Sequence, residues 1–161
     1  LLNRPTDLQL SDEDIFYLDD DGIPEEESDT PHETNVWQMN FGGDIAGLYD
    51  EKPMIVCLHN VARWKSLDDG GDMNDVVMKD VMVTSHHAAR ALVASGEASP
   101  EDFFVFFGFA GWDPGMLREE IERGSWTMVA ANAPTIWNEL QAQRSETNLA
   151  QAGFKMWHNL M

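Results

Sequence analysis

The sequence predicts one α+β domain in which helices flank an open, barrel-like and largely antiparallel β-sheet. Two observations lead to this fold class. The chain has 161 residues, 43% of them hydrophobic, and its six Trp and eight Phe can fill one core. Short segments with strand alternation are interspersed with segments of helical periodicity, and Gly, Pro and Asp separate them.

The N-terminal part of the chain is strongly acidic. Residues 5–51 contain 15 of the 29 acidic residues and neither Lys nor Arg. Because charged stretches of low hydrophobicity stay solvated, residues 7–34 are expected to be acidic and loop-rich. Within them, Ile15, Phe16 and Leu18 form an apolar patch that predicts one helical turn capped by Ser11.

Two strand patterns follow the acidic segment. Apolar side chains alternate at positions 37, 39 and 41, and Gly42-Gly43 ends this strand. The run MIVCLHNV at 54–61 predicts a more deeply buried strand, which is expected to pair antiparallel with the first. Its Cys57 is expected to be a buried, inert thiol.

The middle of the chain predicts a turn at 67–75, a short strand at 80–84, a helix and a central strand. Thr84 or Ser85 caps the helix and Gly96 ends it. We expect Ala88 and the residues 91–93 to face the sheet. The most apolar segment, FFVFFGF at 103–109, predicts a central strand that is covered on both faces.

The last third of the chain predicts a helix, a strand and two further helices. Asp113 caps the first helix, Pro114 opens it and Gly124 ends it. The side chains expected to face inward are Met116, Leu117 and Ile121. SWTMVAA at 125–131 predicts a strand, and helical patterns begin again at Pro134. Residues 145–161 predict an amphipathic helix whose apolar stripe contains Leu149, Phe154, Trp157, Leu160 and Met161.

The segment FFVFFGFAGWDPGMLREEIERGSW resembles the signature of AlgH/YqgE-like proteins, in which a Gly-aromatic-Ala-Gly-Trp turn leads into a helix with Leu, two acids and Ile, followed by Trp. LLNRPTDLQL resembles the family's Asn-Arg-Pro-Thr turn, and FGGD followed by MIVCLH resembles its Gly-Gly strand pair. The residues that carry the resemblance are Asn3, Arg4, Pro5, Gly42, Gly43, His59, Gly108, Gly111, Trp112, Leu117, Glu120 and Trp126.

The resemblance implies a single AlgH/YqgE-like domain over residues 1–161, with an open, barrel-like sheet and no established reaction. The spacing is closer to plant and algal plastid members than to bacterial ones, so it implies a plastid location. Met116 stands where many bacterial members have Gln, and the acidic stretch 12–34 is longer than usual. In the family, strands precede the Asn-Arg-Pro-Thr turn, so further strands before Leu1 are expected in a complete member.

The residues predict no catalytic, cofactor-binding or metal-binding site. His86 and His87 are adjacent and point about 100° apart on a helix, whereas a zinc pair needs positions i and i+4. Around Asp19-Asp20-Asp21-Gly22, the positions where a calcium loop needs Asp and Glu hold other residues. Glu119 and Glu120 are expected to lie on a polar helix face, and Gly42-Gly43 to form a tight turn rather than a phosphate cradle.

The formal charge of −19 argues against nucleic-acid binding and favours a partner with basic surfaces. No run approaches the roughly 20 apolar residues of a membrane-spanning helix. The leading prediction is a non-enzymatic, acidic protein-interaction or structural subunit in the chloroplast stroma or at the stromal face of the thylakoid, with a photosynthetic complex such as photosystem I as candidate assembly. Predicted docking residues are Asp19, Asp20, Asp21, Glu25, Glu26, Glu27, Phe154, Trp157 and Leu160.

Two alternatives remain open at the level of sequence. One is a small-ligand sensor or enzyme with a pocket near Trp112, where His59 or Glu119 supplies polar groups. The other is a regulatory protein that acts through protein contacts. Trp112 itself either packs beneath its Gly-rich turn or faces a ligand or partner.

Overall fold

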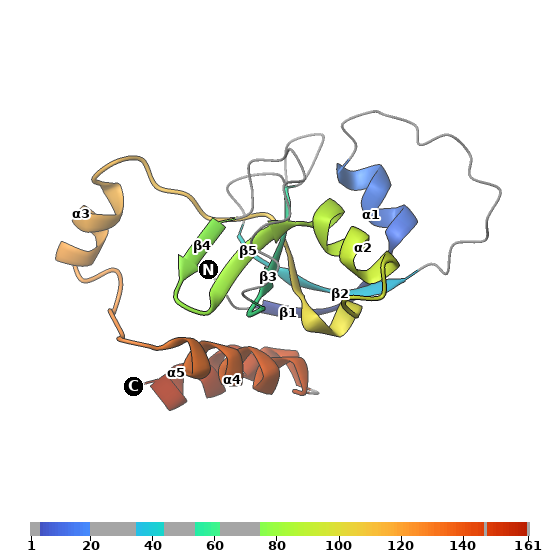
Figure 1. Ribbon diagram of the computed structural model, residues 1–161. Coiled ribbons are helices and arrows are strands. Elements are labelled where there is room, and N and C mark those ends of the chain that lie inside the picture. The colour runs from blue at the N-terminus through green and yellow to red at the C-terminus, as the bar shows by residue number, and fades with distance from the viewer. Residues whose placement is uncertain (1–3, 20–34, 44–53, 62–74, 147, 161) are drawn as a thin grey trace.

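Six strands form one sheet in the order β1-β2-β6-β3-β5-β4 in the computed structural model, which describes residues 4–19, 35–43, 54–61, 75–146 and 148–160 (Figure 1). The strands are β1 (Arg4–Ser11), β2 (Val36–Phe41), β3 (Ile55–His59), β4 (Asp75–Met78), β5 (Val81–Ser85) and β6 (Phe104–Phe107). Only β2 and β6 are parallel among these neighbours. The outer strands β1 and β4 do not pair with each other, so the sheet is open rather than closed into a barrel, and the predicted α+β class is confirmed.

The central position in the sheet belongs to β6. Val105 of β6 lies opposite Met39 of β2 on one side and Cys57 of β3 on the other. The predicted antiparallel pairing of the first two strands was therefore wrong, because β6 separates them. A strand with apolar side chains on both faces is stabilised most where both faces are covered, which is the middle of the sheet.

Helices cover both faces of the sheet (Figure 1). On one side lie α1 (Asp12–Asp19) and α2 (His86–Ala94), and on the other α4 (Ala133–Arg144) and α5 (Leu149–Leu160). A short 3-10 helix (Pro100–Asp102) precedes β6. Alternation around β6 divides the core: Phe103 and Val105 pack with residues of α1 and α2, whereas Phe104 and Phe106 pack with Leu140 of α4.

The helix ends follow the capping pattern of the sequence. The Ser11 hydroxyl accepts a hydrogen bond from the backbone N–H of Asp14, and the Asp14 carboxylate accepts one from the N–H of Ser11. Ser85 caps α2, and Gly96 follows its end with φ of 75°. Residues 7–19 thus form the end of β1 and α1 rather than loop, while 20–34 and 62–74 lie outside the described residues.

Four expectations about the middle and end of the chain were wrong. Helix α3 (Met116–Glu122) begins two residues later than predicted, because Gly115 with φ of 97° is its cap. Met116 and Leu117 are exposed, since α3 stands apart from the sheet and has no core to face (Figure 1). Residues 125–131 form no strand, and Ala91 is exposed. In addition to these four, strand β4 has no counterpart among the predicted strands.

Candidate functional site

The signature glycines lie where β2 and β6 end side by side. The N–H of Gly42 donates to the carbonyl oxygen of Phe107 (2.9 Å), and the N–H of Gly108 donates to that of Met54 (2.9 Å). A Cβ atom on Gly42 would lie 2.1 Å from the carbonyl oxygen of Gly108, and one on Gly43 would lie 2.5 Å from the backbone nitrogen of Ala110. The glycines are therefore required for a close approach of two backbones, which explains the Gly-Gly pair without a bound phosphate.

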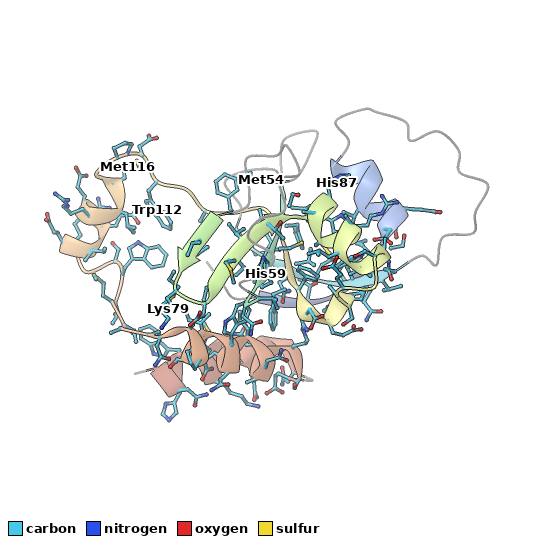
Figure 2. The ribbon with its side chains drawn as sticks, in the orientation of Figure 1. Met54, His59, Lys79, His87, Trp112 and Met116 are labelled. Carbon is cyan, nitrogen blue, oxygen red and sulfur yellow. The ribbon has the colours of Figure 1, made fainter. Side chains whose placement is uncertain are left out.

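Beyond this crossing, the chain leaves the sheet as an arm, defined here as residues 109–132. Figure 2 shows Trp112 and Met116 on the arm, away from the strands. Two indole N–H groups converge on one carboxylate oxygen: Trp112 Nε1 lies 3.0 Å and Trp126 Nε1 2.6 Å from Oε2 of Glu120. The two rings are edge to face, with centroids 5.8 Å apart. In this Trp112–Glu120–Trp126 cluster, the residues that precede and follow α3 are both hydrogen-bonded to a side chain of the helix.

The electrostatics of the cluster favour a charged Glu120. Hydrogen bonds from Trp126 and then Trp112, with a smaller contribution from Arg123, hold the pKa of Glu120 below its usual value. Arg123 Nη2 lies 3.9 Å from Oε1. With donors at one oxygen and a cation near the other, Glu120 serves to hold the arm in shape. The prediction of a merely polar helix face missed this role, although two Trp flanking a Glu-bearing helix are visible in the sequence.

Apolar side chains are exposed along the arm. Met128 has the highest exposed fraction of them, 75%. The other exposed apolar side chains of the arm are Phe109, Met116, Leu117, Trp126 and Val129. Such a concentration on one projecting segment is more typical of a binding surface than of a monomer's ordinary surface.

A second apolar surface lies on α5. Phe154 and Trp157 have exposed fractions of 78% and 52% and are three residues apart, so they share one face of the helix. α5 is held on α4 through Gln143 Nε2, which donates to the sulfur of Met156 (2.8 Å). Lys155 also pairs with Glu146 at the helix connection. Because these contacts fix the helix, Phe154 and Trp157 are presented on a supported surface.

Comparison with known proteins adds the family. A model of the AlgH-like family matches residues 1–157. The chain belongs to the AlgH-like family. Among its relatives, the UPF0301 protein of Idiomarina loihiensis is 26% identical over 98% of this chain and 75% of its own length. That of Nitrosospira multiformis is 31% identical over 91% of this chain and 68% of its own length. These relatives are bacterial.

The fold is also similar to a solved AlgH structure. The solution structure of AlgH from Pseudomonas aeruginosa aligns with a TM-score of 0.51 and 20% identity, over 92% of this chain and 72% of that chain. The two chains therefore share a similar fold. The arm, with its Trp112–Glu120–Trp126 cluster, is the part of this AlgH-like chain that carries the signature.

The other signature residues are scattered over the fold. Arg4 and Pro5 lie in the edge strand β1, opposite Phe41 and Asn40 of β2. Asn3 lies outside the described residues. His59 is buried at the end of β3, where its ring packs against Phe103 and burial lowers its pKa. Figure 2 shows His59 within the body of the molecule and Trp112 on the arm, so His59 does not join Trp112 in a ligand site.

The predicted acidic docking residues fall mostly outside the described part of the chain. Asp19 is the last residue of α1, whereas residues 20–34, with Asp20, Asp21, Glu25, Glu26 and Glu27, are not described. Leu160 ends α5, but the position of its side chain is not described. Of the predicted docking residues, Phe154 and Trp157 are thus the two whose exposure is established.

A buried polar network was missed by sequence reasoning. Asp12, within the acidic run, is buried, and its Oδ1 accepts a hydrogen bond from Trp37 Nε1 (2.6 Å). Its Oδ2 accepts from the backbone N–H and side-chain amide of Asn35 (3.1 and 3.0 Å). His86 Nε2 lies 3.9 Å from Oδ1, and its ring meets Trp37 edge to face. Nothing in the run of acids distinguishes Asp12 from its solvated neighbours.

Metal-binding groups and membrane-spanning helices were sought among the described residues. In these ranges, no group of three or more His, Cys, Asp and Glu side chains is arranged to hold a metal ion. His86 is buried beside Trp37, whereas His87 is exposed. Every helix in the described ranges is too short or too polar to cross a membrane.

Proposed function

We propose that this AlgH-like chain is a non-enzymatic interaction subunit that docks on a larger protein assembly through α5. The observation that carries the proposal is the exposure of Phe154 and Trp157, 78% and 52%, on one face of a helix that is anchored to α4. An amphipathic helix that presents aromatic side chains one turn apart matches the pattern by which helices bind in apolar grooves. Exposed aromatics of this kind are the residues that most often dominate binding energy.

The anchoring of α5 supports binding without prior folding. Asn159 Nδ2 lies 3.3 Å from Oε1 of Glu139, so side chains along α5, from Lys155 to Asn159, contact α4 and its C-terminal end. A helix that is already ordered loses less conformational entropy on binding than a disordered tail does. The two aromatic side chains can therefore contribute most of their burial to affinity.

The charge of the chain defines the partner further. With a net charge of −19, the chain attracts a partner whose groove is rimmed by Lys and Arg, and accelerates its encounter at low salt. The finer form of the proposal places the chain on the stromal face of a photosynthetic complex such as photosystem I. That location rests on the plastid-like spacing of the signature, while the relatives named above are bacterial. It stays a prediction.

Affinity purification from the native source tests the docking surface. The wild-type chain is compared with the Phe154→Ala/Trp157→Ala variant and with Met116→Ala, which removes an exposed apolar side chain from the arm instead. We expect the same proteins with wild type and Met116→Ala, and a loss of about thirtyfold or more in affinity with the double variant, as for interface hot spots of about 2 kcal/mol. Equal recovery with all three proteins would contradict docking through α5.

The location has its own test. If the finer proposal holds, thylakoid complexes prepared in mild detergent carry the chain with them, and moderate salt releases part of it because the attraction is electrostatic. Recovery of the chain in the free soluble fraction alone, at low as well as moderate salt, would contradict the photosynthetic assembly. It would leave docking through α5 on another assembly in place.

A further inference from the structure

One edge of the sheet is apolar and open. Strand β4 is the outermost strand and, among the described residues, pairs only with β5. Val76 and Val77 lie where the register of β4 against β5 shifts, between the pairs Val76–Met82 and Met78–Val81, and their exposed fractions are 50% and 61%. These two apolar side chains of β4 therefore lack cover, and its outer backbone groups offer a template for another strand.

The arm contains a segment with strand character but no strand partner. In residues 127–131, Thr-Met-Val-Ala-Ala, the β-branched Thr127 and Val129 favour extended structure. No backbone hydrogen bond joins this segment to another described residue. Met128 and Val129 are exposed. We call residues 127–131 the unpaired segment.

Both ends of the unpaired segment are fixed. At its start, Trp126 donates to Glu120 within the cluster of the arm. At its end, Asn132 caps α4 by accepting the backbone N–H of Thr135 (3.0 Å). A segment held at both ends loses less entropy when it adds to a sheet than a free tail does. The backbone of the segment is thus available for pairing at reduced cost.

Charge distinguishes the unpaired segment from the rest of the chain. Residues 124–138 form the longest run without Asp, Glu, Lys or Arg, at 15 residues, in a chain of net charge −19. In β4, Asp75 is the only charged residue, and residues 76–78 carry no charge. Two copies of such an acidic chain repel each other wherever carboxylates meet, so they can approach closely only through surfaces of this kind.

We propose that the unpaired segment of one copy adds as a strand to β4 of a second copy, and that the exchange is reciprocal. A two-fold axis then makes the same contact twice, which doubles the apolar surface that a single strand addition buries. Met128 and Val129 of one copy pack with Val76 and Val77 of the other. The occupant of the β4 edge is therefore this chain itself, in a symmetric dimer.

Figure 1 is consistent with this exchange. The arm projects from the body on the side of β4, which is the outer edge of the sheet, and α3 lies beyond that edge. An arm that reaches past its own sheet edge can contact a neighbour. The dimer surface is distinct from the aromatic face of α5 that carries the proposed function.

Sedimentation equilibrium of the purified chain tests the proposal without any partner. We expect the dimer mass for wild type, and at least a tenfold weaker dimer for Met128→Glu and for Val77→Glu, since each places a carboxylate in an uncharged, apolar contact between two acidic chains. Met116→Glu is the matched control, because it adds the same charge to an exposed position of the arm outside the unpaired segment. It should leave the dimer unchanged.

Three outcomes would overturn the proposal. One is a monomer at every concentration. Pairing of the unpaired segment with β4 of the same copy would give this result. Another is a dimer that none of the variants weakens, which would assign self-association to a different surface. The third is equal weakening by Met116→Glu, which would reduce the effect to added charge. Far-UV circular dichroism verifies that each variant is folded. A negative result leaves docking through α5 untouched, because that is measured by partner recovery.

Discussion

Acidification should destabilise the protein through His86. This side chain is 4% exposed and lies at the start of α2, next to Trp37. The pKa of His86 is lowered from 6.5 to about 4, mainly by burial, with smaller contributions from Arg90 and His87, although Asp12 acts to raise it. Burial outweighs the attraction of Asp12, whose Oδ1 is 3.9 Å away, so His86 is neutral in the folded protein at neutral pH.

The sign and size of the effect follow from proton linkage. Between pH 6.5 and about 4, the unfolded chain binds a proton at His86 that the folded protein does not bind. The free energy of unfolding is therefore at its full value above pH 6.5 and falls as the pH is lowered. The shift corresponds to a loss of about 2 kcal/mol between pH 7 and pH 5, and about 3 kcal/mol by pH 4.

Urea denaturation as a function of pH measures this loss. His86→Gln removes the titrating group, so its free energy of unfolding should fall less steeply with pH than that of wild type, by about 2 kcal/mol between pH 7 and pH 5. A constant destabilisation of the variant at all pH values does not affect this slope. His87→Gln, at the exposed neighbouring position, should retain the slope of wild type. Parallel curves for wild type and His86→Gln would refute the reasoning.

Two further predictions concern the signature residues. Gly42→Ala should lower the free energy of unfolding by about 1–3 kcal/mol, the range for overpacked sites, because its Cβ would meet the carbonyl oxygen of Gly108 at 2.1 Å; urea denaturation measures this, and an unchanged midpoint would contradict the close approach. Glu120→Leu should loosen the arm, because two indole N–H groups lose their acceptor, and the indole N–H resonances of Trp112 and Trp126 should then exchange with solvent faster in NMR spectra than in wild type. The indole resonance of Trp37, which donates to Asp12 elsewhere in the fold, serves as the internal control.

Much of the local structure could be predicted from the sequence. The apolar run around β6 predicted a strand buried on both faces, and its side chains do divide between two core clusters. Ser11, Ser85 and Gly96 predicted helix ends correctly, because capping depends on side chains within a few residues of the backbone groups they satisfy. The signature predicted the family, which the comparison confirms over residues 1–157.

The candidate binding surfaces were harder to predict from the sequence. The amphipathic pattern predicted α5 and offered Phe154 and Trp157 as docking residues, but only the structure shows that they face outward, since periodicity defines a stripe and not what covers it. The same limit made Met116 and Leu117 appear inward-facing. Residues 125–131 have the composition of a strand, yet pairing needs a free edge in the right place, and β-propensity does not supply one.

The sequence by itself determined which segments are apolar, where most helices begin and end, the acidic character of the chain and its membership of the AlgH-like family, because these depend on residues close together along the chain. Only the tertiary structure decided that β6 lies between β2 and β3, that Gly42 and Gly108 meet, and that Trp112 and Trp126 share one carboxylate. Each of these three contacts joins segments that are separated along the chain. Which segments become neighbours depends on burial across the whole fold rather than on local conformational preference.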